Sequence, residues 1–198
     1  MLHNLLKNKK IVLASASPRR ANILNQIGLK FIQIPADICE ELFESQHISP
    51  KKYVNVLALE KCRYIKNQLT DDCLIIAADT TVYLDRKIIG KPLDIDEAVF
   101  FLKLLSNRTH LVYTGLAISY GNKLLSGYEK SCVKFKNLSE QEIYDYIETK
   151  EPLDKAGAYG IQGFGAQFIE KLNGCYFNVM GLPVNLLYEL VCKISTVD

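Results

Sequence analysis

The segment CLIIAAD, residues 73–79, constrains the fold more than any other stretch of this sequence. It is a continuous apolar run that closes on a carboxylate, and it lacks the alternation of a strand with one face in water. Such a run is typical of a strand that has helices packed on both of its faces. The rest of the chain must therefore supply helices as well as further strands, which favours an α/β fold.

Two helices have clear local start signals. Ser17-Pro18 and Ser49-Pro50 each place a preferred N-cap residue before a proline, which suits the first helical position because its missing N–H needs no partner there. We predict that the first of these helices ends at Gly28, since glycine is the usual residue just beyond a helix. The second is predicted to continue to residue 69.

The remaining elements follow from periodicity, turn residues and caps. Strands are predicted over 10–14, 30–35, 109–120 and 124–135, a hairpin over 81–90, and helices over 94–106, 140–148 and 181–194. The helix over 140–148 begins with the capping-box pattern of Ser139 and Glu142. Strands mixed with helices in this order predict a sheet covered by helices.

Length and charge limit the classes of protein to which the chain can belong. We expect one domain over residues 1–198, with two lobes at most. A net charge of +2 gives no overall attraction to nucleic acid or to an anionic membrane. No run approaches the roughly 18 apolar residues of a membrane span. We therefore expect neither a nucleic acid nor a membrane as partner.

The six cysteines include no CxxC pair, and the N-terminal segment does not have the pattern of an export signal. In a chain of this kind they are expected to be reduced and mostly buried thiols. Zinc ligation is not expected either, because the three histidines are scattered along the chain. The sequence thus predicts a protein of the cytoplasm.

Arg19 and Arg20 fall in the first turn of the helix that begins at Ser17. That turn is the positive end of the helix dipole, where each cation is unfavourable by roughly 0.3–1 kcal/mol. The arginines either pair with carboxylates of a neighbouring element or form an anion site with the unsatisfied N–H groups of the helix start. We favour a phosphate site, because a guanidinium binds two oxygens at once.

Asp79 is predicted to end its strand, at the place where open α/β folds bind their ligands. The alternative is an aspartate that caps or turns the chain. Lys91 stands between a glycine and a proline, which suits a phosphate contact but also a solvated turn. Lys61 is a further possible contact, although a solvated helix face also explains it.

The segment 154–165 holds four glycines together with Tyr159 and Gln162. Glycine permits close approach of the backbone and unusual dihedral angles. One amide such as that of Gln162 matches the adjacent donor and acceptor on the edge of uracil or thymine. The alternative is a glycine-rich connection between strands with a buried tyrosine. The segment does not fit the G-x-G-x-x-G pattern of a dinucleotide-binding fold.

No histidine stands in these segments, and no nucleophile elbow is visible. A hydrolase built on them would use carboxylates for base chemistry, together with a hard cation that offsets phosphate charge. Glu40, Glu41 and Asp79 are the candidates.

Taken together, these segments resemble the Maf family of nucleoside triphosphate pyrophosphatases. The resemblance rests on LASASPRR, the acidic residue Glu40, LEKC around Lys61, ADTTV, IIGKP and EPLDKAGAYGIQGFGAQFIEKLNGCYFNVMGLPV, in the order of the family. It implies an elongated, mixed central sheet flanked by helices, with two lobes and an active-site cleft, as in inosine triphosphatases. It also implies hydrolysis between the α and β phosphates, a divalent cation such as Mg²⁺ or Mn²⁺, and a homodimer.

The resemblance also assigns roles. Asp79 matches the proton acceptor, and Glu40 an acidic active-site position that would share the metal with Asp79. The positions that match phosphate contacts are Ser15, Arg19, Arg20, Lys61 and Lys91. Those that match base preference are Arg19, Thr80 and Gln162, and they are similar to the branch that acts on dTTP and UTP. The alternatives are a purine or 7-methyl-GTP pyrophosphatase of the same fold and a nucleotide-sensing regulator of septum formation and cell division.

Overall fold

The computed structural model describes residues 1–39, 48–69 and 72–195. Its strands are β1 (Ile11–Leu13), β2 (Ile32–Gln33), β3 (Leu74–Leu84), β4 (Lys87–Ile89), β5 (Thr109–Tyr120), β6 (Lys123–Phe135) and β7 (Ile169–Asn173). Its α-helices are α1 (Leu2–Leu5), α2 (Pro18–Gln26), α4 (Pro50–Lys66), α5 (Ile95–Leu105), α6 (Glu140–Glu148), α7 (Tyr176–Met180) and α8 (Val184–Ser195). Three 3₁₀ helices, η1 (Glu151–Asp154), η2 (Ala156–Ala158) and η3 (Gly163–Phe168), make up most of the glycine-rich segment.

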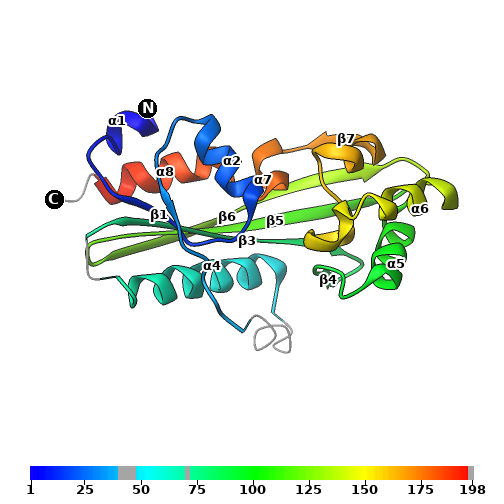
Figure 1. The fold of residues 1–198 in the computed structure, drawn as a ribbon, viewed down its shortest axis with the longest axis horizontal. Coiled ribbons are helices and arrows are strands. Elements are labelled where there is room, and N and C mark those ends of the chain that lie inside the picture. The colour runs from blue at the N-terminus through cyan, green and yellow to red at the C-terminus, as the bar shows by residue number, and fades with distance from the viewer. Residues whose placement is uncertain (40–47, 70–71, 196–198) are drawn as a thin grey trace. The chain divides into compact units, whose positions relative to one another are not determined.

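The strands form one mixed sheet of seven strands in the order β2-β1-β3-β5-β6-β7, with β4 paired to β3 (Figure 1). β1 is parallel to both β2 and β3. The pairs β3–β4 and β6–β7 are antiparallel. The predicted mixed α/β sheet flanked by helices is therefore confirmed.

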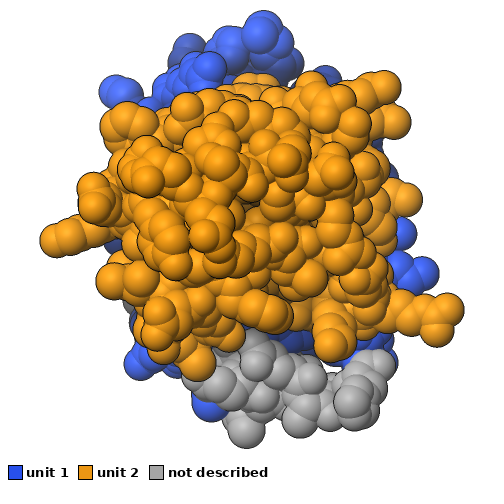
Figure 2. Space-filling view, turned by 90° about the vertical axis from the view of Figure 1, so that its right-hand side faces the viewer, with its two compact units in different colours: residues 1–79, 114–129, 181–198 blue, residues 80–113, 130–180 orange. Residues whose placement is uncertain are grey.

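The chain divides into two compact units, which Figure 2 shows in different colours. Unit 1 comprises residues 1–79, 114–129 and 181–198, and unit 2 comprises residues 80–113 and 130–180. The division falls within β3, between Asp79 and Thr80, so this strand belongs to both units.

In unit 1, α4 covers one face of the sheet, and α2 and α8 cover the other (Figure 1). Alternate strand residues such as Ile75 and Ala77 pack in one cluster with Ala58, Cys62 and Ile65 of α4. Their neighbours Leu74 and Ile76 point to the opposite face and are also fully buried. Helices therefore cover both faces of this strand, as its continuous apolar run predicted.

Gly115 of β5 lies directly against α4. A Cβ at this position would lie 2.2 Å from the carbonyl oxygen of Val54, a backbone atom. We expect Gly115→Ala to lower the free energy of unfolding by roughly 1–3 kcal/mol, the usual cost of overpacking. Denaturant titration measures this, with Gly90→Ala as control because nothing lies within 4 Å of a Cβ there. Equal losses in both variants would contradict the close contact.

Unit 2 has its own apolar core. Side chains of β3, β5 and β6 pack with α5, α6 and the glycine-rich segment, and Phe135, Tyr146 and Phe168 are the largest of those that are fully buried. The predicted hairpin is present as β3–β4, closed by Asp85 and Arg86. Both turn residues have positive φ, as a two-residue type I′ hairpin requires.

Two local predictions need correction. Asp79 does not end its strand, because β3 continues to Leu84 through residues that are mostly β-branched or aromatic. The six cysteines are thiols outside any disulfide, as predicted, but of these only Cys62 and Cys73 are buried. Cys132 of β6 and Cys192 of α8, for example, lie on faces of their elements that are only partly covered.

The helix predictions are confirmed apart from their ends. α2 ends at Gln26, and Gly28 has the positive φ of a helix terminus, whereas α4 stops at Lys66, short of residue 69. The capping box of Ser139 and Glu142 is fully formed. Within the described residues, no helix combines the length and the hydropathy needed to cross a bilayer.

Candidate functional site

The loop between β1 and α2 is built around Ser15. Its hydroxyl oxygen accepts hydrogen bonds from the Ser17 amide at 3.2 Å and from Nη1 of Arg20 at 2.9 Å. Nε of Arg20 donates to the carbonyl of Gly181 at 2.8 Å, and Nε2 of Gln33 donates to the carbonyl of Ser15 at 2.8 Å. The loop is therefore tied to both β2 and the segment before α8.

These contacts fix the guanidinium of Arg20 in the first turn of α2. Ser17 occupies the N-cap position, but its side chain makes no capping hydrogen bond, and the proline follows as predicted. Ser15 and Gly181 hold Arg20 through neutral acceptors, a hydroxyl and a carbonyl. The positive charge of the guanidinium adds to that of the helix dipole, as an anion site requires.

Lys61 and Asp79 form a buried ion pair in unit 1. Nζ of Lys61 lies 2.6 Å from Oδ1 of Asp79, and the two side chains are only 10% and 9% exposed. Asp79 shares the face of β3 that carries Ile75 and Ala77, which is the face under α4. The interpretation of Lys61 as part of a solvated helix face is wrong, because the residue lies on the buried side of α4.

The predicted metal site is only partly described. Glu40, and Glu41 beside it, lie outside the described residues. Among the residues that are described, no group of three or more His, Cys, Asp or Glu side chains is placed to hold a metal. Asp79 is thus the one predicted ligand whose surroundings are known.

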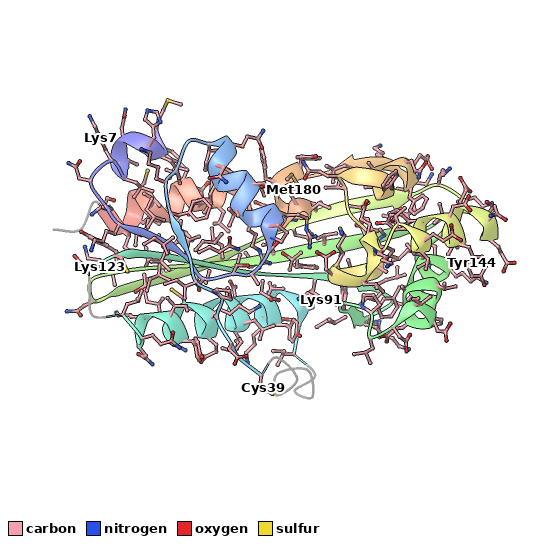
Figure 3. All side chains as sticks on the ribbon, viewed as in Figure 1. Lys7, Cys39, Lys91, Lys123, Tyr144 and Met180 are labelled. Carbon is pink, nitrogen blue, oxygen red and sulfur yellow. The ribbon has the colours of Figure 1, made fainter. Side chains whose placement is uncertain are left out.

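In unit 2, the segment that carries Lys91 is attached to the glycine-rich segment. Lys91 lies exposed between β4 and α5 (Figure 3). The preceding residue, Gly90, accepts a hydrogen bond from the amide of Gly157 at 2.9 Å. Gly157 has a φ of +70°, and a Cβ there would lie 2.8 Å from Val82, so glycine is needed at this contact. Two segments that are far apart in sequence therefore meet here.

Gln162 stands in the same glycine-rich segment, just before η3, and is exposed. Thr80 is half-buried and follows Asp79 directly on β3. Tyr159 is buried, as the alternative interpretation of this segment expected. Of these two side chains, the amide of Gln162 is thus exposed to solvent and the ring of Tyr159 is not.

A sequence comparison decides the family. The family model described as Maf-like protein matches residues 10–194. The chain belongs to the Maf family. The match spans the residues that form the sheet, the Ser15 loop, the Lys61–Asp79 pair and the glycine-rich segment.

Curated Maf relatives named dTTP/UTP pyrophosphatase match nearly the whole chain. The one from Clostridium beijerinckii is 46% identical, and the match covers 94% of this chain and 100% of the relative. The one from Caldicellulosiruptor bescii is 44% identical over 94% of this chain and 96% of the relative. The one from Aquifex aeolicus is 41% identical over the same shares.

Among solved structures, the Ham1 protein of Staphylococcus aureus aligns with a TM-score of 0.51. The alignment covers 96% of this chain and 100% of that protein, at 15% identity. At this identity the likeness supports the fold alone.

The predicted Maf positions divide between the two units. Ser15, Arg19, Arg20, Lys61 and Asp79 lie in unit 1, and Thr80, Lys91 and Gln162 lie in unit 2. The structure joins Ser15 to Arg20 and Lys61 to Asp79 by direct contacts. These two pairings are properties of this Maf chain that its sequence did not reveal.

Nothing in the sequence links a histidine to the glycine-rich segment, yet the structure places one there. Nε2 of His110, on β5, lies 2.6 Å from the hydroxyl of Tyr159. The rings of His110 and Tyr159 both pack edge-on against Phe135. The only signal available was a lone histidine in a strand of otherwise uncharged residues.

His110 gives the stability of this Maf protein a pH dependence. It is 1% exposed, and burial lowers its pKa from 6.5 to about 4. The unfolded chain therefore binds more protons between these values, so stability is complete above the unfolded pKa and falls as the pH drops toward the folded one. We expect a loss of about 1.5 kcal/mol between pH 6.5 and pH 5.

Denaturant titration at several pH values measures this loss. The difference between the wild type and His110→Gln isolates the histidine, because the carboxylates are common to both proteins. Parallel profiles of the two proteins over this range would contradict the buried neutral imidazole.

Proposed function

We propose that this chain hydrolyses dTTP and UTP between the α and β phosphates, releasing pyrophosphate and the nucleoside monophosphate. The observation that carries the proposal is the likeness, at 41–46% identity over nearly the whole chain, to relatives named dTTP/UTP pyrophosphatase. The buried Lys61–Asp79 pair and the arginines at the start of α2 supply the charges that this chemistry needs.

Arg19, Arg20 and the start of α2 would hold the triphosphate. Arg20 is fixed by Ser15 and Gly181, so its charge is positioned before a nucleotide arrives. Pre-positioned cations stabilise phosphate charge without the cost of ordering their side chains during the reaction. Lys91 would add a further positive charge from its exposed segment.

Asp79 would orient the attacking water and accept its proton. In the structure its charge is compensated by the ammonium of Lys61, which lies 2.6 Å from Oδ1. A triphosphate gives the ammonium of Lys61 a further anion to bind. As Lys61 turns toward a phosphate oxygen, Oδ1 of Asp79 is released from the ammonium and can accept a hydrogen bond from the water. Substrate binding and activation of the base are coupled in this way.

A divalent cation, Mg²⁺ or Mn²⁺, fits the chemistry of these residues. Asp79 offers the carboxylate oxygens that such ions prefer, and Mg²⁺ commonly takes one or two carboxylates together with substrate phosphates. Asp79 and Glu40 would hold the ion in this chain. When bound, the ion supplies neutralisation of phosphate charge and a lowered pKa of water.

Gln162 would read the base. Its exposed amide offers one donor and one acceptor, which match the edge of uracil and thymine. We expect Gln162→Ala to raise KM for dTTP and UTP about 10-fold and to leave kcat within about 2-fold, since base contacts act equally on the ground and transition states. Steady-state kinetics measure both constants.

Gln167→Ala is the matched control, because it removes the same exposed amide five residues further along the same segment. It should leave both constants unchanged. An equal rise in KM in the two variants would contradict the assigned role of Gln162.

A panel of nucleoside triphosphates, with the released products identified, tests the proposal as a whole. We expect dTTP and UTP to be the preferred substrates. Preference for a purine or for 7-methyl-GTP would place the chain in another specificity class of the same fold. Saturable binding without product would favour the nucleotide-sensing regulator. The expected homodimer and cytoplasmic location stay predictions, which light scattering and cell fractionation test.

A further inference from the structure

The glycines of the segment 160–165 are packed around one carboxylate and one phenol. A Cβ at Gly163, where φ is +73°, would lie 2.5 Å from Oε2 of Glu151. A Cβ at Gly165 would lie 2.7 Å from the hydroxyl of Tyr146, and one at Gly160 would lie 3.2 Å from Oε1 of Glu151. The close approach that the glycines permit is therefore an approach to Glu151 and Tyr146, two residues of the protein itself.

Hydrogen bonds hold the segment in this place. The carboxylate of Glu151 accepts from the amide of Phe164 at 2.9 Å and from the amide of Gly165 at 3.3 Å. It also accepts from the hydroxyl of Tyr146 at 2.9 Å, and that hydroxyl in turn accepts from the amide of Gly160 at 3.3 Å. Glu151 thus anchors one end of the segment directly and the other through Tyr146.

The anchor is well suited to precise positioning. Tyr146 is 2% exposed, and burial and the adjacent carboxylate of Glu151 raise its pKa, so the phenol stays protonated and keeps donating. Hydrogen bonds to an ionised acceptor are stronger than those between neutral groups. All three donors to the carboxylate of Glu151 are neutral and directional, and two of them belong to the backbone that has to be placed.

Gln162 lies between the two anchored ends. Its side chain is exposed. Its backbone, by contrast, is held at Gly160 on one side and at Phe164 and Gly165 on the other. The side chain is therefore available to a ligand, while the backbone that carries it is fixed.

We infer that Glu151 is a positioning residue for base recognition, which sets the place of Gln162 through the backbone of the segment 160–165. This inference rests on the proposed function, since it concerns how the same site selects its pyrimidine substrate. Glu151 touches neither substrate nor reacting atoms and acts only through Gln162.

The substitution Glu151→Gln tests the anchor with little change of shape. An amide has one acceptor oxygen, whereas the three donors around Glu151 use both carboxylate oxygens. Its NH₂ group would therefore face a backbone N–H or the tyrosine hydroxyl hydrogen. We expect KM for dTTP and UTP to rise about 10-fold, with kcat and inhibition by pyrophosphate within about 2-fold of the wild type.

Two further measurements separate positioning from general damage to the fold. In the Gln162→Ala background, Glu151→Gln should raise KM by no more than about 2-fold, because the residue through which it acts is gone. Amide hydrogen exchange should become faster at Phe164 and Gly165 in Glu151→Gln. Glu148→Gln is the matched control, because it removes an equal, exposed charge three residues away at the end of α6.

The inference is overturned if Glu151→Gln leaves KM unchanged while Gln162→Ala raises it, or if the two effects on KM multiply in the double variant. It is also overturned if exchange at Phe164 and Gly165 is unaltered. A wild-type chain that neither binds nor hydrolyses dTTP would defeat the proposed function instead. In that case the exchange measurement would still decide whether Glu151 anchors the segment.

Discussion

Replacing Asp79 by asparagine is expected to lower kcat for dTTP hydrolysis about 1,000-fold, within the usual range for loss of a general base. The amide keeps the size of the carboxylate and an oxygen that accepts from Nζ of Lys61, so the local structure should persist. Nucleotide affinity should stay within a few-fold, because the cations at the start of α2 are untouched. Pyrophosphate release and calorimetric titration with dTTP measure the two quantities.

Asp85→Asn is the matched control for this substitution. Asp85 is an exposed aspartate that accepts from Arg108 at 2.6 Å in the β3–β4 turn. It lies outside every proposed catalytic contact, so its variant should turn over dTTP like the wild type. If Asp79→Asn kept most of its kcat, Asp79 would not be the base.

Replacing Lys61 by methionine is expected to lower the free energy of unfolding by about 3 kcal/mol at pH 7, because a buried carboxylate loses its partner. The double variant Lys61→Met with Asp79→Asn should recover most of the stability at pH 7. Denaturant titrations at about pH 7 measure these differences in stability.

Lys103→Met provides the comparison for Lys61→Met. Its ammonium also lies 2.6 Å from a carboxylate, that of Glu140, but the two side chains are 44% and 75% exposed. Water screens the charges of an exposed pair, which then contributes little to stability, so this variant should be nearly as stable as the wild type. Similar losses in both variants would show that burial does not strengthen the Lys61–Asp79 interaction.

Much of the fold could be predicted because its signals are local. The Ser-Pro openings of α2 and α4 and the capping box of α6 each depend on a few adjacent residues. The apolar run of β3 indicated the helix-covered sheet for the same reason. The predicted end of that strand was wrong. Asp79 ends the run of apolar residues, but the strand itself continues through it to Leu84.

The site was predictable as a set of residues but not as a set of contacts. Lys61 has the helical spacing of the buried residues Val54, Leu57 and Ile65, yet a charge in such a pattern says nothing about its partner on another element. The pairing of Tyr159 with His110 joins residues 49 positions apart, and only the tertiary fold brings them together. The glycines around Gln162 likewise did not indicate that the carboxylate of Glu151 packs against them.

The position of the cut in the triphosphate is the sharpest test of the proposed chemistry. Phosphorus NMR of the purified chain with dTTP and Mg²⁺ identifies the products without a coupled enzyme. We expect inorganic pyrophosphate and dTMP to appear together in equal amounts. Release of inorganic phosphate with dTDP, or binding of dTTP without any product, would contradict hydrolysis between the α and β phosphates.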